Sequence, residues 1–201
     1  MLFLRWAGVL TAVTVASMQP AMAQEKPKTK SLDVAITYDA VRANHSAVDS
    51  FWMQGGAVEL GVGLYRKLGV AARIEGLHSA PSMANGVPLS MVVVVVGPRY
   101  RLTTRGGRYA LFGEGLVGYA DGFRSQFPQN SGAAGTTSTQ ITTNANALAI
   151  ETGGGVDVRL SRKIAIRPIE ASYLRTQFPN FTTNVQNSLR VGAGLMFVLS
   201  R

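Results

Sequence analysis

The two histidines of this sequence each precede a serine, and histidine close to serine is a pairing that can activate a hydroxyl for nucleophilic attack. The pairs are His45-Ser46 and His78-Ser79. Adjacent residues on an extended strand point to opposite faces, so neither histidine can activate the serine that follows it. A cross pair, such as His78 with Ser46, would require two distant loops to meet. We therefore interpret these residues as polar side chains near a rim, and no catalytic residue is assigned.

A second pattern with chemical meaning runs from Gly113 to Gly118, where GEGLVG matches the phosphate-binding GxGxxG loop. That loop needs a following helix whose N-terminus meets the pyrophosphate. Residues 119–123 read YADGF instead, which is typical of a strand end and a turn. Close packing in a β wall explains these glycines better. Two histidines and no cysteine also make a poor metal site, so neither a cofactor nor a metal is expected.

Charged side chains alternate with apolar ones along several segments, which places the charges on one face of each predicted strand. Glu59, for example, lies between Val58 and Leu60. Acids and bases mixed among glycines are typical of a narrow barrel lumen filled by paired charges. A bulge at Pro168-Ile169 would bring Glu170 to the same face as Arg167. The predicted lumen network comprises Glu59, Arg73, Glu75, Asp157, Arg159, Arg167, Glu170 and Arg190.

Eight segments have the alternation of a strand, and they position these charges. The predicted strands are residues 32–44, 55–65, 69–78, 89–101, 108–120, 148–160, 164–175 and 189–199. Short connections (66–68, 102–107, 161–163) alternate with longer ones (45–54, 79–88, 121–147, 176–188), as in an up-and-down outer-membrane barrel. Each segment is near the ~9–11 residues that a tilted strand needs to cross a bilayer. Pro98 and Pro168 inside strands predict a bulge or a kink.

The longest predicted loop, 121–147, carries the candidate surface contacts. Residues 129–147 are uncharged and rich in Asn, Ser, Thr, Gly and Ala, so mobility is expected there. Phe123, Arg124 and Phe127 offer the aromatic and cationic side chains that are enriched at binding hot spots. A mobile, uncharged spacer that only shields the surface is an equal alternative.

The composition and the N-terminal residues limit the class of protein that this sequence can encode. The formal net charge of +9 comes from scattered Lys and Arg, which does not favour nucleic acid and would suit anionic lipid headgroups. Residues 1–23 are predicted to be a signal peptide, with Arg5, a short apolar run and an Ala-Met-Ala cleavage site. Residues 24–31 form a flexible lead, and 32–201 the barrel domain.

The C-terminal strand resembles the assembly signal of bacterial outer-membrane barrels through Arg190, Gly192, Leu195 and Phe197, although four residues follow Phe197. Residues 153–178 and 187–197 resemble the end of small eight-stranded barrels of the outer membrane protein β-barrel domain group. That group is related in architecture to opacity proteins and to the transmembrane domain of outer membrane protein A. The resemblance implies the fold and an outer-membrane location in a Gram-negative bacterium, but no single activity.

Three functions remain open at this stage. The first is a monomeric, porin-like outer-membrane barrel without an open pore, with a structural or surface-interaction role. Its expected partners are outer-membrane lipids including lipopolysaccharide, the barrel assembly machinery during insertion, and an unidentified external partner. The second is an outer-membrane lipid A deacylase or acyltransferase. The third is a soluble secreted β-barrel that binds an apolar ligand. The apolar face opposite the charges favours the first.

Overall fold

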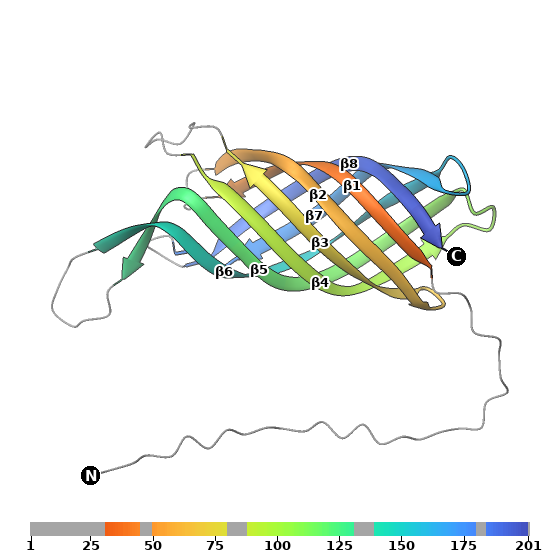
Figure 1. The fold of residues 1–201 in the computed structure, drawn as a ribbon, viewed down its shortest axis with the longest axis horizontal. Helices are drawn as coiled ribbons and strands as arrows, with labels where there is room; N and C mark the ends of the chain where they lie inside the picture. The colour runs from red at the N-terminus through yellow and green to blue at the C-terminus, as the bar shows by residue number, and fades with distance from the viewer. Residues whose placement is uncertain (1–30, 45–49, 80–87, 131–138, 180–183, 201) are drawn as a thin grey trace, which may run out of the picture.

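The computed structural model describes residues 31–44, 50–79, 88–130, 139–179 and 184–200. The predicted signal peptide and nearly all of the predicted lead lie outside these residues. Eight strands make up the fold (Figure 1): β1 (Leu32–Asn44), β2 (Ser50–Tyr65), β3 (Leu68–His78), β4 (Ser90–Thr103), β5 (Tyr109–Asn130), β6 (Thr139–Arg159), β7 (Ile164–Thr176) and β8 (Gln186–Ser200).

Every strand pairs antiparallel with its neighbour in sequence, and β8 pairs with β1, so the sheet closes into a barrel. The prediction of an all-β, eight-stranded, antiparallel up-and-down barrel is confirmed. Closure leaves the body of the barrel without an unpaired edge, as a sheet in hydrocarbon requires. Within the described ranges, no helix is long and apolar enough to cross a membrane.

The two ends of the barrel differ. At one end, called here the short-turn end, residues 66–67, 104–108 and 160–163 join β2 to β3, β4 to β5 and β6 to β7. The chain enters β1 and leaves β8 at this end, where Leu32 pairs with Ser200. At the opposite, long-loop end, residues 45–49, 79–89, 131–138 and 177–185 make the connections. The predicted alternation of short and long connections is therefore confirmed.

The predicted loop 121–147 is wrong in its extent, because β5 and β6 continue through most of it. β5 has 22 residues and β6 has 21, and together they project beyond the barrel as a hairpin (Figure 1). The alternation of Asn144, Ala145, Asn146 and Ala147 explains the strand, since the alanines are buried and the asparagines exposed. β2 also begins five residues earlier than expected, at Ser50 rather than residue 55.

One of the two predicted proline irregularities is present. The pairing of β7 with β8 shifts register between Arg167 and Glu170, and Pro168 and Ile169 both face outward there. This bulge turns Arg167 and Glu170 to the same side, as expected. Pro98 causes no such shift: Arg99 pairs with Glu114 in the same register in which Val96 pairs with Val117.

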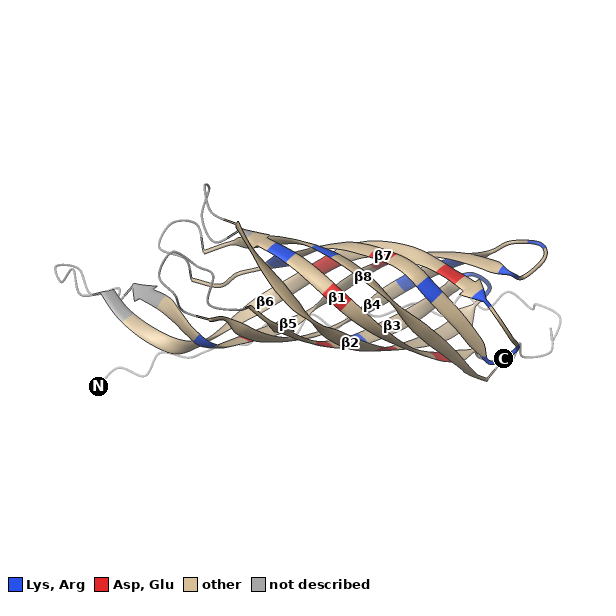
Figure 2. Cartoon of the chain, turned by 90° about the horizontal axis from the view of Figure 1, so that it is seen from above, with Lys and Arg blue, Asp and Glu red and all other residues tan. Residues whose placement is uncertain are grey.

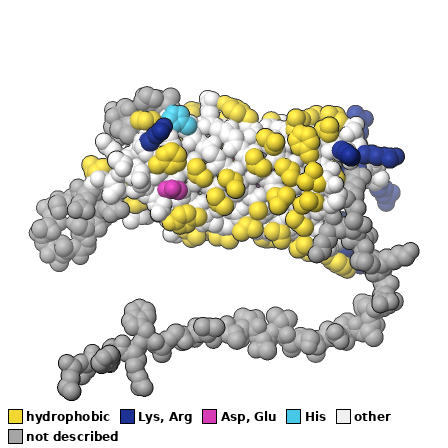
Figure 3. Space-filling view, viewed as in Figure 1, with side chains coloured by type: hydrophobic (Ala, Val, Ile, Leu, Met, Phe, Trp, Pro, Cys, Tyr) yellow, Lys and Arg dark blue, Asp and Glu magenta, His cyan; other side chains and the backbone are white. Residues whose placement is uncertain are grey.

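The outer wall is apolar. Large hydrophobic side chains project outward from all eight strands, including Ile36, Val58, Ile74, Val94 and Leu195, each more than two-fifths exposed. Figure 3 shows these side chains spread over the wall, with basic side chains at the short-turn end. Tyrosines lie toward both edges of the wall, where their hydroxyls can reach polar groups: Tyr38 donates to Gln54 Oε1 at 2.6 Å and Tyr173 to Asn187 Oδ1 at 2.6 Å.

Candidate functional site

The charged interior is the most elaborate polar structure in the molecule. Figure 2 marks the positions of acidic and basic residues along the strands of the barrel. Seven of the eight charges predicted for the lumen are fully buried: Glu59, Arg73, Glu75, Asp157, Arg167, Glu170 and Arg190. The eighth, Arg159, lies half-exposed at the short-turn end, where its guanidinium faces Gly107 of the β4–β5 turn.

Arg73 forms the centre of the network. Its Nη2 lies 2.5 Å from Glu59 Oε2, 2.5 Å from Glu170 Oε1 and 3.4 Å from Glu114 Oε1. Its Nη1 lies 3.1 Å from Glu151 Oε1. The five residues come from five different strands, since Glu59 is on β2, Glu114 on β5, Glu151 on β6 and Glu170 on β7. One guanidinium therefore ties together strands that lie across the lumen from one another.

Arg167 and Arg190 extend the network on either side of this centre. Arg167 contacts Asp157 Oδ1 at 2.9 Å, Glu59 Oε1 at 2.9 Å and Glu170 Oε2 at 2.6 Å. Its guanidinium also lies 4.2 Å from the centre of the Phe112 ring, a cation–π contact away from water.

Arg190 has three carboxylate partners on other strands. Its Nη2 lies 2.5 Å from Glu151 Oε1 and 2.6 Å from Glu170 Oε1, and its Nη1 lies 3.4 Å from Glu75 Oε2. Because Glu170 also contacts Arg73 and Arg167, the three arginines form one continuous cluster.

Six members of the network were not predicted: Asp33, Asp39, Arg99, Arg101, Glu114 and Glu151. Arg99 pairs with Glu59 and with Glu114 Oε2, the latter at 2.8 Å. Arg101 bridges Asp33 and Asp157 near the short-turn end. Alternation was the available signal, because Arg99 and Arg101 continue the buried face of Val93 and Val95. Glu114 was overlooked because it belongs to the GxGxxG match at residues 113–118. That match lies within strand β5 and is followed by no helix.

Carboxylates outnumber arginines inside the barrel. Eight acids are buried: Asp33, Asp39, Glu59, Glu75, Glu114, Glu151, Asp157 and Glu170. Five arginines meet them: Arg73, Arg99, Arg101, Arg167 and Arg190. Every arginine of this set contacts at least two carboxylates, whereas Glu75 contacts one arginine, Arg190, at 3.4 Å. Each arginine is therefore more critical to charge balance than each acid.

The half of the interior toward the long-loop end is largely apolar instead, with the uncharged polar residues Thr176, Gln186 and Ser188 also buried there. Val41, Met53, Met91, Leu116 and Leu174 are almost completely buried and belong to one hydrophobic cluster. Phe127 and Phe178 extend the cluster outward and stack on each other with ring centres 5.4 Å apart. Gly122 leaves room for both rings, because a Cβ there would lie 2.6 Å from Phe127 and 3.1 Å from Phe178. The lumen is thus lined by charged side chains in one half and mainly by hydrophobic side chains in the other.

The three predicted surface contacts have different fates. Arg124 is exposed and has a φ of 57°, at the point where the β5–β6 register shifts between Phe123 and Phe127. Phe123 is half-buried. Phe127 is only 5% exposed, so the expectation that it forms a surface contact is wrong. The bulge at Arg124 turns the ring of Phe127 inward, where it stacks on Phe178.

One of the two histidine–serine pairs lies within the described residues. His45 and Ser46 lie outside the described residues. Ser79 is buried and its hydroxyl accepts a hydrogen bond from the Leu89 amide at 3.0 Å. His78 instead has a cross-strand partner that the sequence did not suggest: its Nδ1 lies 3.0 Å from Ser90 Oγ.

The residues of the C-terminal pattern have structural roles in the barrel. Arg190 belongs to the lumen network, and Leu195 is exposed on the lipid-facing wall with Phe197 half-buried beside it. Gly192 faces inward, where a Cβ would lie 1.9 Å from Asp39 Oδ1. The strand therefore needs a glycine at this position to accommodate the Asp39 carboxylate.

A closed barrel with an apolar outer wall and paired charges inside is a transmembrane β-barrel, because such a wall is stable only against hydrocarbon. No family model and no curated protein matches this sequence. The fold is similar to that of Neisserial surface protein A (NspA), with 14% identity, 83% of this chain and 96% of that chain covered, and a TM-score of 0.59.

A second solved structure is Ail, the attachment invasion locus protein of Yersinia pestis, in complex with the heparin analogue sucrose octasulfate. It is 15% identical over 84% of this chain and 98% of that chain, with a TM-score of 0.50. At these identities the likeness concerns the fold, which is that of small eight-stranded outer-membrane barrels. Together with the lipid-facing wall, this fold makes the chain an integral outer-membrane β-barrel protein.

Proposed function

We propose that this barrel is a membrane-anchored platform that conducts no solute and presents the β5–β6 hairpin outside the cell. The observation that carries the proposal is that the wall, the lumen and the hairpin of the barrel have different surroundings. The wall faces lipid, the lumen is filled by side chains, and the hairpin is the part that projects from the barrel (Figure 1). Since β8 and β1 close the sheet within one chain, the platform is expected to act as a monomer.

A filled lumen supports the absence of an open pore. The largest fully buried side chains are Arg73, Arg167 and Arg190, and they meet carboxylates from across the barrel. An eight-stranded barrel has an interior that side chains can fill. Purified protein in planar bilayers is expected to give no large, stable conductance steps; such steps would contradict this part of the proposal.

Orientation is the first point to test. Long loops lie outside and short turns lie in the periplasm in barrels of this kind, so Arg124 should face the medium and Arg162 the periplasm. The chain has no cysteine, which allows Arg124→Cys and Arg162→Cys to be labelled separately with a membrane-impermeant maleimide. We expect labelling of Arg124→Cys in intact cells, and of Arg162→Cys only after the outer membrane is opened. The reverse result would invert the proposed topology.

The charge of the long-loop end indicates the chemistry of an external partner. Arg42, Arg124 and Arg175 are exposed there, and Asp121 is the one exposed acid among the described residues. Such a surface favours a polyanion. Because Ail was solved with a heparin analogue, heparin is a suitable probe.

Cells that display this barrel should therefore adhere to immobilised heparin. Replacing residues 124–144 with a short Gly-Ser link should abolish adherence and leave the heat-modifiable gel mobility of the barrel intact. A matched variant, Lys163→Gln at the other end, should adhere normally. Undiminished adherence of the truncated barrel would refute a role for the hairpin.

One observation favours a second candidate function. His78, which is exposed, lies within hydrogen-bond reach of Ser90, which is buried, where β3 pairs with β4 near the long-loop end. In this arrangement, Ser90 Oγ could attack an acyl ester of lipid A while His78 Nδ1 takes the hydroxyl proton and passes it to the departing lipid A hydroxyl as the ester C–O bond breaks. Water would then hydrolyse the acyl-serine, which releases the fatty acid and restores Ser90. Lipid A mass spectra should then lose an acyl chain with wild-type protein but not with Ser90→Ala. Ser50→Ala is the matched control, and identical spectra with and without the wild-type protein would exclude this activity.

A further inference from the structure

The charges on the outside of the barrel are distributed very unevenly. Of the 11 acidic residues, Glu25 and Asp49 lie outside the described residues, and eight of the remaining nine are buried in the lumen. Only Asp121 is exposed, and it belongs to the long-loop end. Six exposed bases lie at the short-turn end, in the three turns: Arg66, Lys67, Arg105, Arg108, Arg162 and Lys163. This end of the molecule is therefore strongly cationic.

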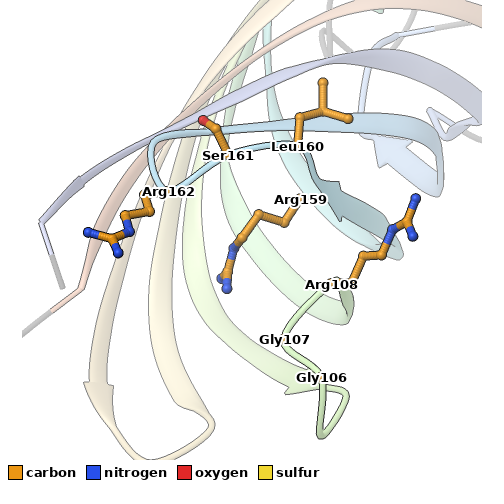
Figure 4. Close-up of a pocket in the computed structure, with 7 residues that line it drawn as sticks. All are labelled: Gly106, Gly107, Arg108, Arg159, Leu160, Ser161 and Arg162. Atoms are coloured by element: carbon orange, nitrogen blue, oxygen red, sulfur yellow. The ribbon is translucent and has the colours of Figure 1, made fainter.

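Two of these turns flank an open surface hollow of about 280 Å³ (Figure 4). Arg159 lies between the turns, with Arg108 and Arg162 pointing away on either side. The described lining contains no carboxylate. The Arg159 amide donates to the Arg108 carbonyl at 2.8 Å, which fixes one turn relative to the other. The hollow thus has a defined backbone frame, with Arg159 between the two turns and the Arg108 and Arg162 guanidinium groups directed outward from its rim.

Glycine shapes one side of the hollow. Gly107 has a φ of +66°, a conformation that L side chains rarely adopt. A Cβ on this residue would also lie 3.2 Å from Arg159 Nη1. Gly107 therefore allows both the tight turn and the position of the Arg159 guanidinium.

The hollow adjoins the lipid-facing wall. Leu160, which lines it, is 63% exposed, and Tyr109 begins the neighbouring strand with its ring 46% exposed. The Arg108 guanidinium lies 5.8 Å from the centre of the Tyr109 ring, so the boundary between apolar and cationic surface is abrupt. A ligand that fits this boundary has an acyl chain beside a negative charge.

We propose that the hollow between the β4–β5 and β6–β7 turns binds the phosphate of an anionic phospholipid whose acyl chains lie along Tyr109 and Leu160. The orientation given under the proposed function assigns this lipid to the inner leaflet, but the binding chemistry does not depend on that orientation. Guanidinium groups suit phosphate because their donors match its oxygens. The site lies at the short-turn end, apart from the lumen network and from the hairpin at the other end.

The test compares two triple variants with equal loss of charge. One replaces Arg108, Arg159 and Arg162 with glutamine, and the other replaces Arg66, Lys67 and Arg105. Binding of phosphatidylglycerol and of phosphatidylcholine with the same acyl chains is measured on detergent-solubilised, folded protein by native mass spectrometry. Heat-modifiable mobility on gels verifies folding of both variants.

We expect wild-type protein and the second variant to prefer phosphatidylglycerol. The first variant should lose at least about tenfold in affinity for it, because each basic side chain near an anionic surface contributes roughly fivefold before screening. Phosphatidylcholine binding should not change. Equal losses in both variants would show a diffuse cationic surface and overturn the site. Binding of inorganic phosphate as tight as that of phosphatidylglycerol would overturn its assignment to a lipid.

Discussion

The two halves of the barrel interior are built on opposite principles. Toward the short-turn end, arginines and carboxylates contact one another across the lumen, as Arg73 does with Glu59 and Glu170. Toward the long-loop end, residues such as Met53 and Leu174 pack without any charge. Charge contacts specify partners and register, because each arginine must meet particular carboxylates. Apolar packing specifies volume alone. The difference indicates that the charged half determines how the barrel closes, and the apolar half fills and caps it.

The largest expected effect comes from removing the central arginine. Arg73→Met leaves four carboxylates without this partner, and breaking even one buried pair costs about 3–5 kcal/mol. The free energy of unfolding should fall by at least that amount, measured by urea titration in vesicles with the lipid-facing Trp52 as the fluorescent reporter. The double variant R73M/E170Q should recover part of the loss. If it does not, packing rather than charge explains the role of Arg73.

A smaller effect is expected in the apolar half. Leu174 is completely buried, and Leu174→Ala should lower the free energy of unfolding by about 2–5 kcal/mol through the cavity it leaves. Leu189 is the matched control, since it lies 57% exposed on the lipid-facing wall. Leu189→Ala should cost only about 0.5 kcal/mol, because lipid fills the space. Equal costs, measured by the same urea titration, would mean that the outer half of the lumen is not tightly packed.

The smallest effect should come from removing a surplus acid. Glu75→Gln should leave the free energy of unfolding unchanged or raise it by up to about 1 kcal/mol, because carboxylates exceed arginines and this one has a single arginine contact, at 3.4 Å. Glu170→Gln is the comparison, since Glu170 contacts three arginines and its loss should destabilise the barrel. A large loss from Glu75→Gln would show that the acids are not in surplus.

The charged half was largely predictable from the sequence, and the apolar half was not. Alternation assigns Glu59 and Arg73 to the lumen because their neighbours are suited to lipid. Near the long-loop end both faces are apolar, as in the valine run 92–96, where alternate valines are buried and exposed. Alternation in hydropathy then disappears, although the strand remains. The sequence alone therefore does not separate lumen from lipid there.

The projecting hairpin was missed for a related reason. Residues 139–147 have little hydrophobicity, so they give no burial signal of the usual kind. The alternating alanines are small enough to face a narrow space, and Ala145 and Ala147 are indeed buried. The inward turn of Phe127 depends on Arg124 at a φ of 57° and on Phe178 from the β7–β8 connection. A single sequence does not reveal that these distant residues meet.

The length of the hairpin sets a stand-off distance from the membrane. β4 pairs with β5 only as far as Phe123, so residues 124–130 extend beyond β4, and 127–130 have β6 as their one paired neighbour. At about 3.3 Å per residue, this segment adds roughly 20 Å along its own axis. Cross-strand pairing with β6 joins residues 127–130 to a second strand, so the described part of the hairpin is a two-stranded arm. A partner bound to this arm would be held near a fixed height above the bilayer, where a second, weaker contact with the same membrane gains a high effective concentration.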